Sequence, residues 1–424
     1  MSHHQPPQLQ ACQTTLFRVN LKFKLPPKFQ KYASLGVIPK ILLLPFALLA
    51  VFLMRLIRPL LLIQICEVYK HRIGHFAIET ELIRLNTKKR QQSGQRVLTV
   101  YYFPDKHPAN KQLEVMWRRE LPTVHRSWGW LLNKLTKKSR TFNITSQRTQ
   151  IDRDGLLTEF APLLKFTSEE LNRSEIARLN LTSGEKFICL HVRDTAYYSN
   201  SFGYTNHQLF RNTDIQTYVQ ASEALAEMGY TVFRMGAIVK EPLVSKHPKV
   251  IDYATNGMRT DFLDIYLGAH CAFTITTSSG WDSIPTIFRR PCMKLNVLPV
   301  CQPELFLFPY IFLPKLIVDA ETESYLSLNQ IFDHGISKLY DINLYSEAGV
   351  KIQDLSSEEL VEAVTEMVQR FEGTFVETPE QKEMQAKLKH ILSTHPKLQP
   401  SPNYYPIRAQ FASCFLSRYP NFLD

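Results

Sequence analysis

The segment FICLHVRD, residues 187–194, constrains the fold of this chain more than any other. Its first six residues are almost wholly apolar, and His191, Arg193 and Asp194 follow within its polar end. A strand without alternating polar residues is typical of a parallel sheet covered on both faces, where ligands bind beside the carboxyl ends of the strands. An arginine there suits two phosphate oxygens, although a salt-bridged arginine at a strand end is the alternative.

The pattern after residue 187 predicts a parallel sheet. Apolar strand-like runs alternate with segments of helical spacing, which is typical of right-handed strand–helix–strand units. The expected strands are 187–192, 230–235, 250–253, 272–276 and 292–298, and the expected helices are 214–228, one from about 260, and 282–288. Upstream, the strands 60–69 and 97–103 flank an amphipathic helix within 71–85, so a second α/β unit precedes the first.

A chain of 424 residues is long enough for two domains with extensions. We expect a basic tail and apolar helix over 1–58, and an acceptor-side α/β domain over 59–182. A Rossmann-like nucleotide-sugar domain should follow over 183–372, with a helical extension over 373–424. A capping box at Ser356 and Glu359 predicts a helix near the end of the third region.

Charge and cysteine usage restrict the partners and the compartment. The formal charge of +11 favours anionic partners, but no nucleic-acid-binding module is evident, which leaves phosphorylated substrates and acidic membrane surfaces. The seven cysteines are odd in number and show no C-x-x-C spacing. This usage is typical of a reducing compartment, so we expect a cytosolic protein without a disulfide framework.

An apolar run near the N-terminus, residues 41–54, lies between basic residues and is interrupted by Pro45. It is short for a spanning helix, and extending it to residue 65 would place Arg55 and Arg58 near the middle of the span. Three interpretations stay open: an in-plane or re-entrant membrane helix, a buried core or interface helix, and a true span within 37–66. We expect peripheral binding to the inner face of the cytoplasmic membrane.

Several expected strand ends carry polar residues that could form one site. Because carboxyl ends of parallel strands meet at one edge, these side chains should lie close together. Hydroxyls and free N–H groups at a helix start favour a phosphate, although simple capping is the alternative for the two serines. The predicted donor-binding residues are His191, Arg193, Asp194, Arg234, Gly236, Asp252, Tyr253, Ser278, Ser279 and Gly280.

In the first domain, His75 follows Gly74 at an expected helix start, and Glu79 lies one helical turn later. Histidine is the commonest general base, and a carboxylate one turn away could orient it. A capping or packed histidine is the alternative. We predict His75, Glu79 and Arg193 as catalytic residues.

Other motifs are absent or weak. The sequence has neither a Walker loop nor a G-x-G-x-x-G fingerprint. Asp152 and Asp154 form a formal D-x-D, but Gly155 follows and favours a turn. No zinc spacing is convincing, so we expect no metal and no cofactor besides a nucleotide-sugar co-substrate.

Several ordered blocks resemble a family of bacterial glycosyltransferases found with surface-polysaccharide and capsule genes. They are RIGHFAIETE, HVRDTAYY, FRNTDIQTY, FRMG, IDYA, RTDFLDIYLGAH and SSGWDSIPTIFRRPCMKLNVLP, within residues 60–300. The chain is more distantly similar to the fucosyltransferase superfamily, whose H-x-R motif corresponds to His191 and Arg193. Asp194 stands where that superfamily often has a second arginine. The resemblance implies a GT-B-like fold, with two Rossmann-like domains facing each other across a cleft.

The resemblance also implies an activity. It is a metal-independent, inverting transfer of a hexose or deoxyhexose from a nucleotide-diphospho-sugar to a glycan or lipid-linked glycan in bacterial surface-polysaccharide synthesis. A non-catalytic scaffold that binds nucleotide or glycan is the first rival, and phosphoryl transfer is the second. The cluster of Arg193, Arg234 and Ser279 argues against the scaffold, which needs no diphosphate site. Phosphoryl transfer would need metal-binding carboxylates, for which only Asp194 and Asp252 qualify.

Overall fold

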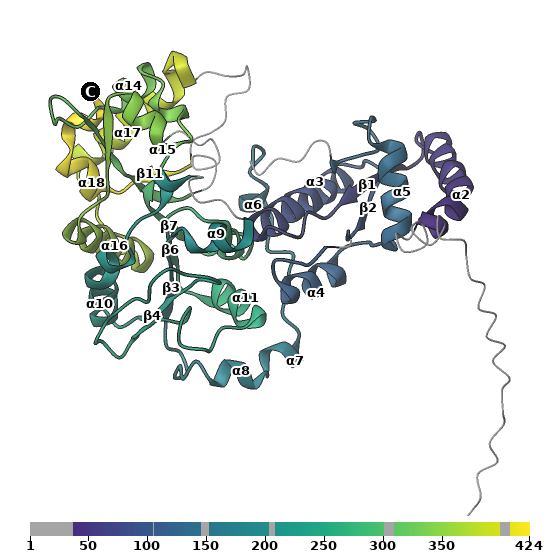
Figure 1. Ribbon diagram of the computed structural model, residues 1–424, viewed down its shortest axis with the longest axis horizontal. Helices are drawn as coiled ribbons and strands as arrows, with labels where there is room; N and C mark the ends of the chain where they lie inside the picture. The colour runs from purple at the N-terminus through teal and green to yellow at the C-terminus, as the bar shows by residue number, and fades with distance from the viewer. Residues whose placement is uncertain (1–36, 105, 146–151, 203–207, 301–308, 399–407) are drawn as a thin grey trace, which may run out of the picture.

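The computed structural model describes residues 37–104, 106–145, 152–202, 208–300, 309–398 and 408–424. The chain forms two α/β parts, a smaller N-terminal one and a larger C-terminal one (Figure 1). The predicted α/β fold with parallel sheets in both parts is therefore confirmed. The two parts nevertheless differ greatly in the size of their sheets.

The N-terminal part is built on two parallel strands, β1 (Leu62–Glu67) and β2 (Val97–Tyr102). Single parallel bridges widen this sheet on both sides, from Ile65 to Asn143 and from Tyr101 to Thr123. The helices of this part are α2 (Val37–Leu56), η1 (His75–Glu79), α3 (Thr80–Gln92), α4 (Lys111–Glu120) and α5 (Arg126–Thr136). Three short helices, α6 (Leu156–Glu159), α7 (Ser168–Leu171) and α8 (Ser174–Ala177), lead to the second part.

The C-terminal part holds a seven-stranded, all-parallel sheet in the order β11-β8-β7-β6-β3-β4-β5. Its strands are β3 (Phe187–His191), β4 (Thr231–Arg234), β5 (Val250–Ile251), β6 (Thr274–Thr276), β7 (Cys292–Val297), β8 (Ile311–Pro314) and β11 (Gln410–Phe411). The chain runs from β3 outward to β5, returns to place β6 on the other side of β3, and runs outward again. This order is that of the doubly wound nucleotide-binding fold, and its switch point lies between β3 and β6.

Helices cover both faces of this sheet. Figure 1 shows α10 (Val219–Glu227) and α16 (Ser357–Glu372) on one side of the strands and α11 (Asp261–His270) on the other. The remaining elements are α9 (Ala196–Phe202), η3 (Leu209–Arg211), η4 (Ile215–Tyr218), η5 (Gly280–Asp282), α12 (Ser283–Ile287), β9 (Leu316–Asp319), α14 (Leu328–Asp333), η6 (Ile336–Lys338), α15 (Ile342–Glu347), β10 (Val350–Gln353), α17 (Pro379–Thr394), η7 (Pro396–Leu398), α18 (Ser413–Arg418) and η8 (Pro420–Leu423). The predicted capping box opens α16, where Ser356 and Glu359 bond reciprocally.

The two parts contact each other through a close approach of their backbones and through an ion pair. Gly74 lies so close to Gly280 that a Cβ on Gly74 would come within 3.1 Å of the Gly280 Cα, so this close approach favours glycine. Glu81 of α3 pairs with Arg289 beyond α12 at 2.7 Å, and Glu81 is fully buried. These contacts fix the start of η1 against the loop that follows β6.

The apolar N-terminal segment is the helix α2, which has two faces. Ala47, Val51 and Met54 are buried against residues of β1 and α5, whereas most of the other large apolar side chains are exposed. No helix in the described ranges has the length and apolarity that a membrane crossing requires. The packing of one side of α2 agrees with the interpretation as a core helix, and binding in the plane of a membrane stays a prediction.

Candidate active site

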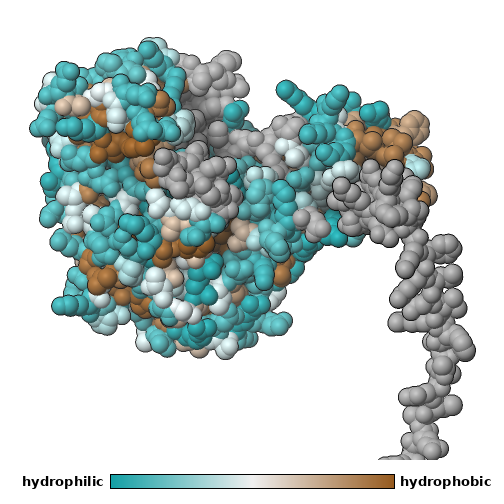
Figure 2. Space-filling view, viewed as in Figure 1, coloured by the Kyte–Doolittle hydropathy of each residue, from teal (hydrophilic) through white to brown (hydrophobic). Residues whose placement is uncertain are grey.

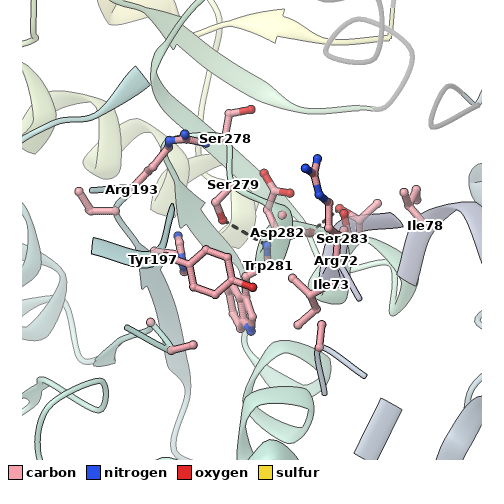
Figure 3. A pocket seen from close by; sticks show the side chains of 18 of the residues that line it. Arg72, Ile73, Ile78, Arg193, Tyr197, Ser278, Ser279, Trp281, Asp282 and Ser283 are labelled. Atoms are coloured by element: carbon pink, nitrogen blue, oxygen red, sulfur yellow. Dashed lines mark hydrogen bonds between the residues drawn. The ribbon is translucent and has the colours of Figure 1, made fainter. Parts of the chain in front are cut away.

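A cavity of about 440 Å³ lies at the carboxyl ends of β3 and β6 and is lined from both parts of the chain. This is the switch point of the large sheet, where ligands bind in doubly wound folds. In Figure 3, Arg193 and Tyr197 lie on one side, loop 278–283 lies in the middle, and Arg72, Ile73 and Ile78 of the N-terminal part lie on the other side.

Arg193 lies two residues beyond the end of β3 and lines the cavity. Its backbone N–H donates to Thr277 Oγ1 at 2.8 Å, and its Nε donates to Asn212 Oδ1 at 3.2 Å. The side chain is largely buried. A guanidinium held in this way keeps one orientation toward the cavity, which is what bidentate recognition of an anion requires.

His191 is the last residue of β3, and its ring stacks on Trp281 with ring centroids 5.8 Å apart. Burial, with a smaller contribution from the charge of Arg234, lowers the pKa of His191 to about 4 although Asp282 and Asp194 oppose the shift, so the ring is neutral at physiological pH. His191 Nδ1 and Trp281 Nε1 are buried without a hydrogen-bond partner among the described residues. Both residues line the cavity, so a bound ligand could supply these partners.

The loop after β6 presents Ser278, Ser279 and Gly280 to the cavity. Ser278 has a left-handed backbone with φ of 61°, a conformation that is costly for a non-glycine residue. Its carbonyl oxygen accepts a hydrogen bond from the Arg211 guanidinium. The Ser279 hydroxyl accepts from the Trp281 N–H at 3.2 Å, so Ser279 caps η5, as the capping alternative anticipated.

The cavity is also lined by Arg211 of η3 and Arg72 of the N-terminal part. Arg72 stood out in the sequence, but neither arginine was predicted as a site residue. Arg211 lies beside Arg193 because loop 208–213 returns over β3, where Thr213 N–H donates to the Arg193 carbonyl at 3.3 Å. Arg211 lies within the block FRNTDIQTY and Arg72 within RIGHFAIETE, so the resemblance carried a signal for both.

Asp194 and Gly236 also lie at the cavity. The Asp194 carboxylate accepts from the backbone N–H groups of Ala196 and Lys240, each at 2.8 Å. It therefore ties together the loops that follow β3 and β4. A Cβ on Gly236 would come within 2.4 Å of the Val239 side chain, so a larger residue at this turn would displace Val239.

The structure does not bring Arg234, Asp252 and Tyr253 to the cavity. Arg234 is fully buried and pairs with Asp252 at 3.2 Å. The other Asp252 oxygen accepts from the Leu243 N–H at 2.9 Å. Tyr253 is buried, with its hydroxyl 3.1 Å from Asp264 Oδ1. These contacts hold the ends of β4 and β5 together beneath the cavity wall.

A buried cation at the cavity was also missed, namely Lys294 of β7. Its ammonium lies 3.1 Å from Asp282 Oδ2 and 4.3 Å from the centre of the Tyr310 ring. Burial alone would lower the pKa of Lys294, but Asp282 and Tyr310 outweigh it and the pKa is raised, so the ammonium stays charged. In the sequence Lys294 lies within the apolar run CMKLNV, and its ion-pair partner Asp282 is recognisable only from the structure.

His75 lies on the opposite wall, in η1 of the N-terminal part. Its Nδ1 is 2.8 Å from Glu79 Oε1, so the expected contact between the two residues is present. η1 is a π-helical turn, a distortion often found at functional sites. Glu79 is buried and His75 is partly exposed. A buried carboxylate in this position fixes the orientation of the imidazole.

The D-x-D sequence behaves as a turn. Asp152 accepts from the N–H groups of Leu156 and Leu157 at 2.8 and 3.0 Å, which caps α6. Within the described ranges, no group of three or more His, Cys, Asp or Glu side chains could hold a metal ion.

The sequence matches no family model and no curated protein. Among solved structures, the E. coli ADP-heptose lps heptosyltransferase II is 12% identical with a TM-score of 0.34, covering 57% of this chain and 88% of that chain. A glycosyl transferase family 9 protein from Veillonella parvula DSM 2008 is 11% identical with a TM-score of 0.42, covering 72% and 97%. E. coli heptosyltransferase WaaC with ADP is 12% identical with a TM-score of 0.29, covering 68% and 99%. At these values the likeness says nothing of this chain's substrate, and the predicted likeness to fucosyltransferases and capsule enzymes stays a prediction.

Proposed function

We propose that this protein is a glycosyltransferase that uses a nucleotide-diphospho-sugar donor. The observation that carries the proposal is the gathering of Arg193, Arg211 and His191 at the switch point of the large sheet, opposite the His75–Glu79 pair. Cations at the carboxyl ends of parallel strands suit a diphosphate, and an opposing histidine suits proton transfer. The resemblance found in the sequence supports the same reaction class.

In the proposed reaction, an acceptor hydroxyl oxygen attacks the anomeric carbon of the donor sugar. The bond from that carbon to the diphosphate oxygen breaks, and the nucleoside diphosphate leaves with the bonding electrons. Arg193 and Arg211 stabilise the charge that develops on the leaving group. Hydrogen-bond donors that are already held in position stabilise such charge most effectively in the transition state. Because this attack takes place in one step, it inverts the anomeric carbon.

The hydroxyl proton moves to His75. Since Nδ1 faces Glu79 at 2.8 Å, the accepting atom is Nε2. Glu79 holds the imidazole in this tautomer and stabilises the imidazolium that forms. The proposal needs no metal ion and no further cofactor. Lys294 keeps Asp282 paired at the floor of the cavity and adds a positive charge there.

For the acceptor we propose a glycan or lipid-linked glycan of a bacterial surface polysaccharide, with the enzyme on the cytosolic side of the membrane. Ile73, Ile78, Ala109 and Leu157 make the N-terminal wall of the cavity partly apolar. An apolar wall suits the faces of sugar rings or a lipid carrier better than it suits a second anionic nucleotide.

Incubation with a panel of nucleotide sugars tests the proposal. The panel should contain hexose and deoxyhexose donors and ADP-heptose, the compound named for a neighbouring structure. Release of nucleoside diphosphate that depends on acceptor would support it. Tight binding of nucleoside diphosphates without any transfer would favour the non-catalytic scaffold, and no binding at all would contradict the proposal.

A further inference from the structure

The positive charge of this chain is concentrated in two segments. Residues 1–66 contain eight Lys and Arg and no Asp or Glu, and residues 121–151 contain six and none. The remainder carries 36 Lys and Arg against all 39 Asp and Glu, a net charge of −3. The whole excess of +11 therefore lies in these two segments, which are separated by more than fifty residues in sequence.

The fold brings the described portions of both segments together. α2 comes from the first segment and α5 from the second, and the two helices pack side by side at the outer end of the N-terminal part (Figure 1). The packed residues are apolar, with Ala47 and Val51 of α2 sharing a cluster with Leu131 and Leu132 of α5. The basic residues of α5 and of the turn after it stay exposed, at Arg126, Lys134, Lys137, Lys138 and Arg140.

The outer side of α2 exposes large apolar side chains along its length. Leu42, Phe46, Phe52 and Leu56 are 68%, 61%, 61% and 65% exposed. Figure 2 shows the corresponding apolar patch over α2 at the tip of the molecule. Arg55 and Arg58 are exposed at the end of this helix, and Trp130 of α5 is partly exposed with the Lys134 ammonium over its ring.

We propose that α2 and α5 together form a docking surface for an anionic lipid bilayer. The apolar side of α2 lies in the plane of the interface, and the basic residues of both helices contact lipid phosphates. A helix with one apolar face and basic neighbours is the usual form of such a surface. Charge selects this occupant over a second copy of the chain, because two copies would bring together two acid-free, positively charged faces.

This inference does not depend on the proposed function, but it bears on the acceptor. The tip that carries α2 belongs to the part that holds His75, so docking would bring the part assigned to the acceptor against the membrane.

The test is flotation of the full-length protein with phosphatidylcholine vesicles, with and without phosphatidylglycerol. Deleting α2 would uncover the apolar residues on which Ala47, Val51 and Met54 pack, among them Leu131 and Leu132, so point variants are used. Leu49→Glu with Phe52→Glu should abolish binding to both kinds of vesicle. Lys134→Gln, Lys137→Gln and Lys138→Gln together should weaken binding to anionic vesicles by roughly tenfold or more.

The matched control is Lys246→Gln, Lys382→Gln and Lys389→Gln, three exposed lysines in the C-terminal part. It makes the same change in net charge and should leave binding unaltered. Equal weakening by both triple variants, or no binding of the wild type to anionic vesicles, would overturn the proposal. Self-association in solution that the Leu49 and Phe52 changes abolish, without vesicle binding, would overturn it in favour of a dimer.

Nucleoside diphosphate binding by every variant, measured without vesicles, separates the two proposals. If a variant retains nucleoside diphosphate binding, its cavity is intact. A loss of vesicle binding in that variant is then due to the change in α2 or α5. If the proposed function is wrong, the wild type will bind the vesicles but will not bind nucleoside diphosphate.

Discussion

The two parts of the molecule use parallel strands in opposite ways. Among the described residues, the large sheet of the C-terminal part has seven strands, and its polar residues gather where β3 and β6 diverge. The sheet of the N-terminal part has two described strands, β1 and β2, and the contribution of this part to the cavity comes from η1 and the turn before it. In a doubly wound sheet the topology itself creates a crevice for a ligand, whereas a small sheet mainly supports what packs on it. The proposed function assigns donor recognition to the part with the large sheet and acceptor activation to the part with the small one.

The largest expected effect separates two arginines of the C-terminal part. Arg193→Ala should abolish transfer and greatly weaken nucleoside diphosphate binding, with the fold retained. Arg193→Lys should also be impaired, because an ammonium cannot replace a bidentate fork. Arg234→Ala should instead destabilise the protein by about 3–5 kcal/mol, since Arg234 is fully buried and its loss removes the charged partner of Asp252.

Calorimetry and thermal unfolding of the three variants check this contrast. If Arg193→Ala unfolds normally yet binds and transfers like the wild type, the assignment of the phosphate site is wrong.

The second prediction concerns His75 and Glu79 of the N-terminal part. His75→Ala should lower turnover by roughly a hundredfold or more, with donor affinity little changed. Glu79→Gln should have a smaller effect, because it removes the partner of Nδ1 but leaves the imidazole. Steady-state kinetics with separate donor titrations measure both. Loss of donor affinity at unchanged turnover would move His75 to the donor site.

A third prediction concerns the ion pair that joins the two parts. Burial raises the pKa of Glu81 from 4.5 to about 7, although Arg289 opposes the shift. A carboxyl with a raised pKa favours the folded state when it is protonated. Its contribution is therefore complete below pH 4.5 and is lost as the pH rises through 7.

In Glu81→Gln the side chain at this position does not titrate. Relative to the wild type, this variant should gain stability as the pH is raised from 4.5 to above 7, measured by denaturant unfolding. A stability difference that is independent of pH would show that folding does not raise the pKa of Glu81.

The smallest expected effect is that of a chelator. The proposed chemistry uses arginines in place of a metal, so transfer should survive EDTA. Loss of turnover that manganese or magnesium restores would bring Asp152 and Asp154 back into consideration, even though Asp152 caps α6.

The sequence predicted the strands of the large sheet closely, because apolar runs that end in polar residues are a local signal. β3, β4, β6 and β7 all lie inside their expected ranges. Arg193 and Arg234 looked alike, since each follows an apolar run. Arg234, however, is the last residue of β4 and pairs with Leu190 of β3 in the sheet. Its side chain is fully buried. Arg193 lies two residues past its strand, in a loop that faces the cavity.

The residues that the sequence missed depend on contacts that are distant in the chain. Lys294 is recognisable only through Asp282, and Arg211 only through the return of its loop over β3. In the N-terminal part, the region between 111 and 181 gave little signal. Its strands are reduced to single bridges at Thr123 and Asn143, which leave no apolar run in the sequence.

The central claim is that the cavity at the switch point recognises a diphosphate through Arg193. Its most direct test is calorimetric titration of the wild type and Arg193→Ala with a nucleoside diphosphate and the matching monophosphate. We predict that the wild type binds the diphosphate more tightly than the monophosphate, and that this preference disappears in Arg193→Ala. Equal affinity of the wild type for both nucleotides, or an unchanged preference in the variant, would contradict the claim.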